Sequence, residues 1–194
     1  MKIFRSPHAA GRWAPSSVAA IGKFDGMHAG HQKLVGLAVK RARALATRSI
    51  LVTFDPMPDQ LLHPGFRPLF PLEQRLELIS GLGVDAAVLL PFDEKFACQA
   101  PEAFARDVLS RALKVVDVFA GSDFCFGRDR AGDLRLLTTL GKEHGFLVHE
   151  VPQIRWKGRK VTDGVIRRML EEGCRADAEH LLGRRVRGHV IHER

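Results

Sequence analysis

The chain of 194 residues has no tyrosine, three cysteines and no long apolar run. Its cysteines are scattered, odd in number and without a Cys-x-x-Cys pair, which argues against a disulfide framework or zinc site and for a reducing compartment. The longest apolar run, residues 86–90, is far too short to span a bilayer, and the first residues lack the apolar segment of a signal peptide. We therefore expect a cytoplasmic protein with no membrane partner.

The net charge of +8 and the pI of about 9.9 permit a nucleic-acid partner or a polyanionic small molecule. The basic residues are dispersed, and no run of basic residues interleaved with aromatic residues provides a stacking platform for single strands. This pattern argues against nucleic acid as the partner and favours a small substrate that carries phosphates.

Two common phosphate-binding signatures are absent. The pair Gly81 and Gly83 has no third glycine at the dinucleotide-binding spacing, and it follows a predicted helix. Gly127 and Gly132 have the spacing of a P-loop, but Asp133 stands where that motif requires lysine. Any phosphate must therefore be bound by a different loop.

The segment Gly22–His31 is the best candidate for that loop, because it joins a predicted strand to a predicted helix over residues 31–45. His28 and His31 lie three residues apart, on one side of the first helical turn. Gly30 between them leaves the backbone open to close approach, and a helix N-terminus offers free N–H donors to an anion. The spacing predicts a nucleotide-phosphate site, although paired histidines in an ordinary strand-to-helix turn would look similar.

Strand-like and helix-like segments alternate along the chain. Strands are predicted over 18–22, 49–54, 84–92, 115–121 and 146–151, and helices over 31–45, 72–82, 102–113 and 134–144. Beyond this core we expect a lead-in with an edge strand over 1–16, a long proline-containing loop up to Pro71, a hairpin over 153–161, and helices over 164–172 and 175–182. The alternation predicts an α/β fold with a doubly wound, mostly parallel sheet, which binds ligands at the carboxyl ends of its strands.

Three motifs occur in order: Gly22-x-Phe24-Asp25-Gly26-x-His28-x-Gly30-His31-Gln32, Thr53-Phe54-Asp55-Pro56-x-Pro58 and Gly121-x-Asp123-Phe124-x-Phe126-Gly127. Together they resemble the adenylyltransferase module of bacterial bifunctional FAD synthetases, in which that module is joined to a riboflavin kinase domain. The resemblance covers residues 17–192. It implies the Rossmann-like nucleotidyltransferase fold, in agreement with the alternation.

The resemblance implies transfer of AMP from ATP to FMN, which yields FAD and pyrophosphate, with Mg²⁺ accompanying ATP. The FMN phosphate is already a nucleophile, so catalysis would consist of positioning and charge neutralisation. A nucleotidyltransferase with another phosphate acceptor, and a nucleotide- or flavin-binding paralogue without turnover, are the alternatives.

The resemblance also implies roles for individual residues, whereas no metal ligand is identified. The expected catalytic residues are His28, His31 and Arg167. ATP binding is expected from these residues and from Gly22, Phe24, Asp25, Gly30 and Thr162. FMN binding is expected from Phe54, Pro56, Pro58, Asp123 and Phe126. For Asp25 and Asp123 a turn role explains the residue about as well, and one of Phe124 and Phe126 is expected in the core.

The chain departs from the family in one motif, Ser-Ser-Thr-x-x-Arg, which here reads Thr162-Asp163-Gly164-Val165-Ile166-Arg167. A carboxylate at Asp163 repels a triphosphate unless Mg²⁺ intervenes, so this departure opposes turnover more than binding. We expect an adenylyltransferase-like domain over 1–185 and a tail over 186–194 that resembles the start of a kinase domain. No Pro-Thr-Ala-Asn motif occurs, so riboflavin kinase activity is expected from another chain.

Overall fold

The computed structural model describes residues 1–186 and is built on a six-stranded, wholly parallel sheet. The strands are β1 (Lys2–Phe4), β2 (Ser17–Ile21), β3 (Arg48–Phe54), β4 (Ala86–Leu90), β5 (Val115–Gly121) and β6 (Leu147–Val151). They lie in the order β1-β4-β3-β2-β5-β6, and every neighbouring pair is parallel. All residues of β2 and β4 are buried, as their uninterrupted apolar sequences require of strands covered on both faces.

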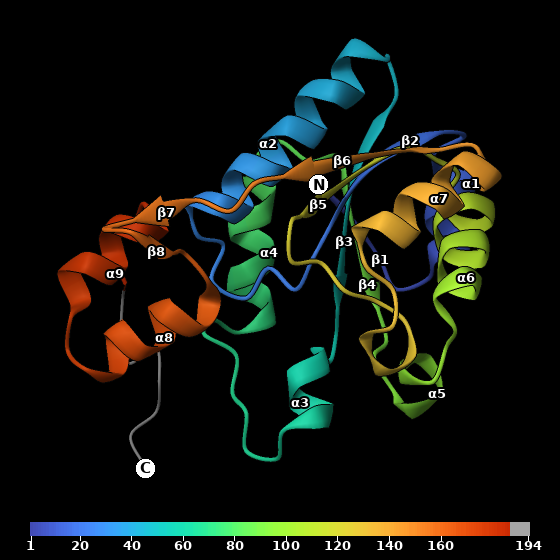
Figure 1. Cartoon of the computed structure of the whole chain (residues 1–194). Helices are drawn as coiled ribbons and strands as arrows, with labels where there is room; N and C mark the ends of the chain where they lie inside the picture. Colours follow the sequence, from blue (N-terminus) through green and yellow to red (C-terminus); the bar gives the residue numbers. More distant parts are fainter. Residues whose placement is uncertain (187–194) are drawn as a thin grey trace.

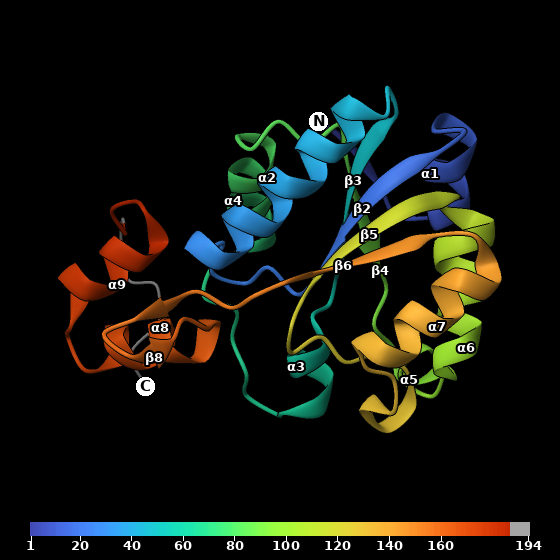
Figure 2. The ribbon, with the colours of Figure 1, turned by 45° about the horizontal axis from the view of Figure 1, so that its top comes forward.

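Helices cover both faces of this sheet (Figures 1 and 2). They are α1 (Pro7–Trp13), α2 (Ala29–Ala44), α3 (Pro58–Leu62), α4 (Leu72–Ser80), α5 (Glu94–Ala97), α6 (Pro101–Ala103), its π-helical continuation η1 (Phe104–Ala112), the 3₁₀ turn η2 (Arg128–Arg130), α7 (Leu134–His144), α8 (Asp163–Glu171) and α9 (Arg175–Leu182). One apolar cluster joins the sheet to α2 and α4, and another joins the opposite face to α1, η1 and α7. The expected doubly wound α/β fold is confirmed.

After β6 the chain forms a smaller unit at one side of the sheet (Figure 1). It consists of the hairpin β7 (Arg155–Trp156) and β8 (Arg159–Lys160) followed by α8 and α9. Leu69 and Phe70, from the segment before α4, complete its apolar cluster. These contacts bring α8 against the segment that follows β2, more than 130 residues earlier in the chain.

The direction in which strands are added to the sheet reverses at β2. The chain runs from β2 to β3 and β4 on one side, and it later adds β5 and β6 on the other. The carboxyl end of β2 is therefore the topological switch point, where doubly wound sheets bind their ligands. The predicted phosphate loop starts there.

Three helices lie where the sequence predicts only irregular chain. The expected edge strand β1 is present, but α1 follows it inside the predicted lead-in, and α3 lies inside the proline-containing loop. The short helix α5 was not predicted either. Pro7 and Gly11 look like helix breakers, yet Pro7 occupies the first turn of α1, where it is tolerated. A Cβ on Gly11 would lie 1.7 Å from the carbonyl oxygen of Ala112, so this glycine allows α1 to pack on η1.

Among residues 1–186, no helix has both the length and the apolar composition that crossing a membrane requires. The expected tail over 186–194 lies, apart from Val186, outside the described residues, so the proposed division into a domain and a tail stays a prediction.

Candidate active site

A buried arginine of α4 stabilises the loop between β2 and α2. Arg75 is 2 % exposed and donates hydrogen bonds to the carbonyl oxygens of Lys23 and Phe24, at 3.0 and 3.3 Å. It also donates to Oγ1 of Thr53 at 3.2 Å, and this hydroxyl donates to the Lys23 carbonyl. These bonds satisfy the buried carbonyl groups that the turn would otherwise leave unpaired.

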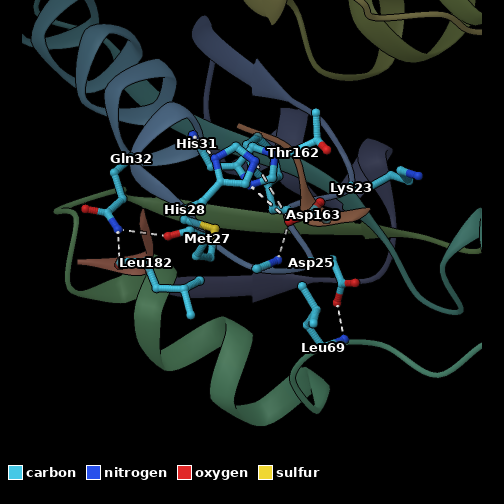
Figure 3. A network of polar contacts seen from close by, with 12 residues as sticks. Lys23, Asp25, Met27, His28, His31, Gln32, Leu69, Thr162, Asp163 and Leu182 are labelled. Carbon is cyan, nitrogen blue, oxygen red and sulfur yellow. Dashed lines mark hydrogen bonds and ion pairs between the residues drawn. The ribbon is translucent and has the colours of Figure 1, made fainter. Parts of the chain in front are cut away.

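The second half of the loop is held from the C-terminal unit. Arg184 donates to the carbonyl oxygens of Gly26 and Met27, at 2.7 and 3.2 Å. The side-chain amide of Gln32 bridges the carbonyl oxygens of Met27 and Leu182 (Figure 3). Cationic and amide donors therefore satisfy the carbonyl groups of this half of the loop.

His28 is the N-cap of α2, and its ring stacks on that of His31 with centroids 3.8 Å apart and planes 15° from parallel. Nδ1 of His28 accepts a 3.3 Å hydrogen bond from the backbone N–H of His31, so the neutral His28 ring carries its proton on Nε2. Phe24 meets His31 edge-on at 5.1 Å. A Cβ on Gly30 would lie 3.0 Å from the His28 ring, so Gly30 provides room for that ring.

Asp163, the first residue of α8, places its carboxylate against this histidine pair (Figure 3). Its Oδ1 accepts a 2.8 Å hydrogen bond from the N–H of Gly26 and lies 3.9 Å from both His28 Nε2 and His31 Nδ1. Nδ1 of His31 is buried and has no hydrogen-bond partner among residues 1–186. A Cβ on Gly26 would lie 2.8 Å from Oδ1, so only glycine fits this contact without a shift.

Burial lowers the pKa of His28 and lowers that of His31 to about 4, and the Asp163 carboxylate only partly offsets this. Burial alone would raise the pKa of Asp163, but the adjacent His31 and His28 and the N–H of Gly26 bring it below its ordinary value. Burial thus favours the neutral form of both imidazoles, and the surroundings of Asp163 favour its carboxylate form.

Asp25 connects the loop to two other segments. Its side chain is almost completely buried, with Oδ1 accepting from the N–H of Leu69 at 2.7 Å and Oδ2 accepting from Nη2 of Arg167 at 2.9 Å. The Arg167 guanidinium also lies over the ring of Phe66. Burial and the charge of Asp163 raise the pKa of Asp25 to about 6. Asp25 thus positions the loop, and Arg167 is paired with it in this structure.

The structure places most predicted nucleotide residues around this loop but changes what some of them do. Phe24 is completely buried, so its ring supports His31 and cannot touch a ligand. A Cβ on Gly22 would lie 3.2 Å from the Phe24 ring, so this glycine serves the packing of that ring. Thr162 caps α8 by accepting a hydrogen bond from the N–H of Val165.

The predicted flavin residues lie on both sides of this loop, because β3 and β5 flank β2. Phe54 ends β3, Pro56 is exposed and Pro58 starts α3, while Asp123 is exposed just after β5. Of Phe124 and Phe126, the structure places Phe126 in the core cluster, where it is 8 % exposed, while Phe124 is partly exposed and packs against it. A role for Phe126 in FMN binding stays a prediction.

Four residues that shape the site were not predicted as site residues: Gly26, Gln32, Arg75 and Arg184. Gly26 and Gln32 belong to the first motif, so the motif itself could have indicated them. The two arginines carry no local signal, because their acceptors are carbonyl groups far away in the sequence.

Comparison with known proteins shows the family of the chain. The family profile described as FAD synthetase matches residues 12–164. A protein of Geobacillus thermodenitrificans assigned as a bifunctional riboflavin kinase/FMN adenylyltransferase is 38% identical over 170 residues, which is 87% of this chain and 90% of that protein. The bifunctional riboflavin kinase/FMN adenylyltransferase of Escherichia coli K12 is 32% identical over 99% of this chain, which spans 63% of that relative's length.

Solved structures share the fold. A structure titled macrolide-efflux protein, from Streptococcus pneumoniae, superposes with a TM-score of 0.81 at 27% identity and covers 94% of this chain and 59% of that one. A pantothenate synthetase from Thermus thermophilus has a TM-score of 0.57 at 18% identity over 94% of this chain and 81% of that one, a likeness of fold alone. On the family profile and the identity to these relatives, the chain belongs to the FAD synthetase family.

Proposed function

We propose that this protein is an FMN adenylyltransferase, which transfers AMP from ATP to the phosphate of FMN and releases pyrophosphate. The observation that carries the proposal is the stacked pair His28 and His31 at the start of α2, placed at the carboxyl end of β2. Membership of the FAD synthetase family supports the same reaction.

In the proposed reaction an oxygen of the FMN phosphate attacks the α-phosphorus of ATP, and the bond from that phosphorus to the pyrophosphate oxygen breaks. No side-chain nucleophile is required. The Nε2–H of His28, fixed by the bond at Nδ1, donates to a phosphate oxygen as negative charge develops on it. The N-terminus of α2 adds its free N–H groups and partial positive charge. His31 stacks on His28 and thereby fixes the orientation of the His28 ring.

Magnesium requires oxygen ligands in octahedral geometry. The convergent side-chain atoms here are two imidazole nitrogens and one carboxylate oxygen, a donor set that does not suit Mg²⁺. We therefore propose MgATP as the substrate form, with the cation bound by the phosphates, and we assign it no ligand in the chain.

On the acceptor side, we propose that the segments after β3 and β5 hold FMN. Phe54 at the end of β3 is a buried core residue, and the partly exposed Phe92 and Phe96 pack against it with ring centroids at 5.7 and 6.1 Å. Phe92 and Phe96 therefore provide the aromatic surface beside the loop. Pro56 and Asp123 are exposed at the same edge of the sheet. Flat apolar surface next to a phosphate site suits a flavin ring better than a flexible pantetheine chain.

The experiment is to incubate the protein with FMN, ATP and Mg²⁺ and to measure FAD and pyrophosphate. We expect product with FMN and none with pantetheine phosphate. Replacing His28 by alanine should lower the rate by on the order of a hundredfold or more, because it removes the positioned donor. Replacing the exposed His8 of α1 by alanine should leave the rate unchanged. FMN and ATP binding without FAD formation would favour the binding paralogue instead.

We propose that a riboflavin kinase activity supplies the FMN and that the protein is cytoplasmic, as the pattern of its cysteines predicts.

A further inference from the structure

The carboxylate of Asp163 occupies the position at which the hydrogen-bond donors of the loop would contact a bound anion. Its Oδ1 accepts a 2.8 Å hydrogen bond from the backbone N–H of Gly26. The same oxygen is equidistant, at 3.9 Å, from Nε2 of His28 and Nδ1 of His31. A phosphate oxygen bound at the start of α2 would use these same groups.

The charge balance at this point favours one carboxylate and opposes a second anion. Both imidazoles are buried, which lowers their pKa values, so they supply little positive charge to balance a second anion. The cations near the site already have partners: Arg167 pairs with Asp25, Lys23 with Asp59, and Arg184 donates to the loop carbonyl groups. Two unit charges about 4 Å apart repel strongly at a partly buried site. A polyphosphate must therefore move Asp163 aside or bind against its charge.

A metal ion held by His28, His31 and Asp163 is the competing explanation, since their ligand atoms lie within 4.8 Å of one another. The ring geometry does not favour it. Rings only 15° from parallel direct their nitrogen lone pairs side by side rather than toward one point. Moreover, Nδ1 of His28 already accepts a hydrogen bond, so its Nε2 carries the proton and has no free lone pair for a metal.

We propose that Asp163 is a resident anion of the phosphate loop, which a nucleotide phosphate has to displace, and that it weakens the binding of polyphosphates by this chain. The proposal rests on the proposed function only in taking this loop as the site for ATP. Asp163 is then a specificity-determining residue, because it sets how much negative charge the loop accepts.

The displacement is feasible in the backbone that the structure shows. Thr162 caps α8 independently of the Asp163 side chain, so the helix keeps its cap when the carboxylate turns away. The next residue, Gly164, has no side chain that could hinder this movement. The space beside it is open, since a Cβ built there would have Thr162 Oγ1 as its one neighbour among the described residues, at 3.9 Å.

The test measures the binding of pyrophosphate by calorimetry, in EDTA and without FMN, for the intact chain and three variants. Asp163→Asn removes the charge with little change in shape, and Asp163→Ser shortens the side chain as well. Asp107→Asn removes the same charge from the exposed ion pairs of η1 and serves as the matched control. We expect both Asp163 variants to bind pyrophosphate on the order of tenfold or more tightly than the intact chain, and the control to match it.

Thermal unfolding provides a second readout that a merely structural role would not move. Pyrophosphate should raise the melting temperature of Asp163→Asn more than that of the intact chain, since a ligand stabilises in proportion to its binding. Equal or weaker pyrophosphate binding by both Asp163 variants would overturn the proposal. Zn²⁺ that binds the intact chain without nucleotide, and is lost in Asp163→Asn, would also overturn it by making the carboxylate a metal ligand.

These outcomes are separate from those of the proposed function. Tighter pyrophosphate binding by the variants, without FAD formation by the intact chain, would keep the resident anion and refute the adenylyltransferase activity. FAD formation together with unchanged pyrophosphate binding would keep the adenylyltransferase and refute the resident anion.

Discussion

Replacing His31 by glutamine should make the protein less sensitive to acid. In the folded chain burial lowers the pKa of His31 to about 4, whereas an exposed histidine titrates near 6.5. Between pH 4 and pH 6.5, His31 is therefore protonated in the unfolded chain and largely neutral in the folded chain. The stability that His31 contributes is therefore complete above pH 6.5 and is lost as the pH falls toward 4.

The shift from 6.5 to about 4 sets the size of this effect. At pH 4.5, two units below the ordinary value, the unfolded chain gains about 2 to 3 kcal/mol from protonating this residue. His28 adds a loss of the same sign, because its pKa is also lowered. Asp25 acts in the opposite direction: its pKa is raised to about 6, so the folded state takes up its proton first as the pH falls. The contributions of His28 and Asp25 are common to the intact chain and the His31 variant, so they largely cancel when the two proteins are compared.

The assay is urea unfolding of the intact chain and of His31→Gln at pH 7 and at pH 4.5. We expect the intact chain to lose about 2 to 3 kcal/mol more than the variant over this range. The exposed His8 of α1, replaced by glutamine, shows how much of the change comes from losing any histidine. If the intact chain and His31→Gln lose the same stability, His31 is not held neutral by burial and the reasoning is wrong.

Three further substitutions test how the loop is held. Arg75→Met should lower the free energy of unfolding in urea by about 2 to 4 kcal/mol, because it leaves buried carbonyl groups without their donor; a loss below 1 kcal/mol would contradict this. Gly26→Ala should cost about 1 to 3 kcal/mol, since its Cβ would meet the Asp163 carboxylate, and part of that cost should disappear when Asp163 is also serine. Gly36→Ala, exposed within α2 with no atom within 4 Å of its Cβ, should raise the melting temperature through a gain of about 0.5 to 1 kcal/mol.

The core of the fold could be predicted because its buried strands are rich in apolar residues and have clear stops. The segment predicted over 84–92 is β4 at Ala86–Leu90, and the one predicted over 115–121 is β5 with the same bounds. The helix α1 could not be predicted in this way. Gly11 lowers helix propensity locally, and only its contact with η1 accounts for it.

The partners within the site could not be predicted, because they come from distant parts of the chain. Asp25 and Arg167 are 142 residues apart, and Gly26 and Asp163 are 137 apart. Sequence spacing indicates which residues share a helical turn, but not which helix packs against which loop. The sequence marked Asp163 as a departure from its family, whereas its hydrogen bond to the loop depends on how the C-terminal unit packs.

Gly22 and Gly30, which the sequence predicts to let ATP approach the backbone, show what the first motif can and cannot predict. Gly22 makes room for the ring of Phe24, and Gly30 makes room for the ring of His28. Both requirements hold with no ligand present, so these glycines indicate the shape of the loop and the orientation of its histidines. The indication of an anion comes instead from two groups of the loop. Nδ1 of His31 has no hydrogen-bond partner within the part of the chain that the structure describes, and the N–H of Gly26 donates to a carboxylate that a ligand could replace. The motif therefore predicts the scaffold, and the unsatisfied donors and acceptors of the folded loop predict the ligand.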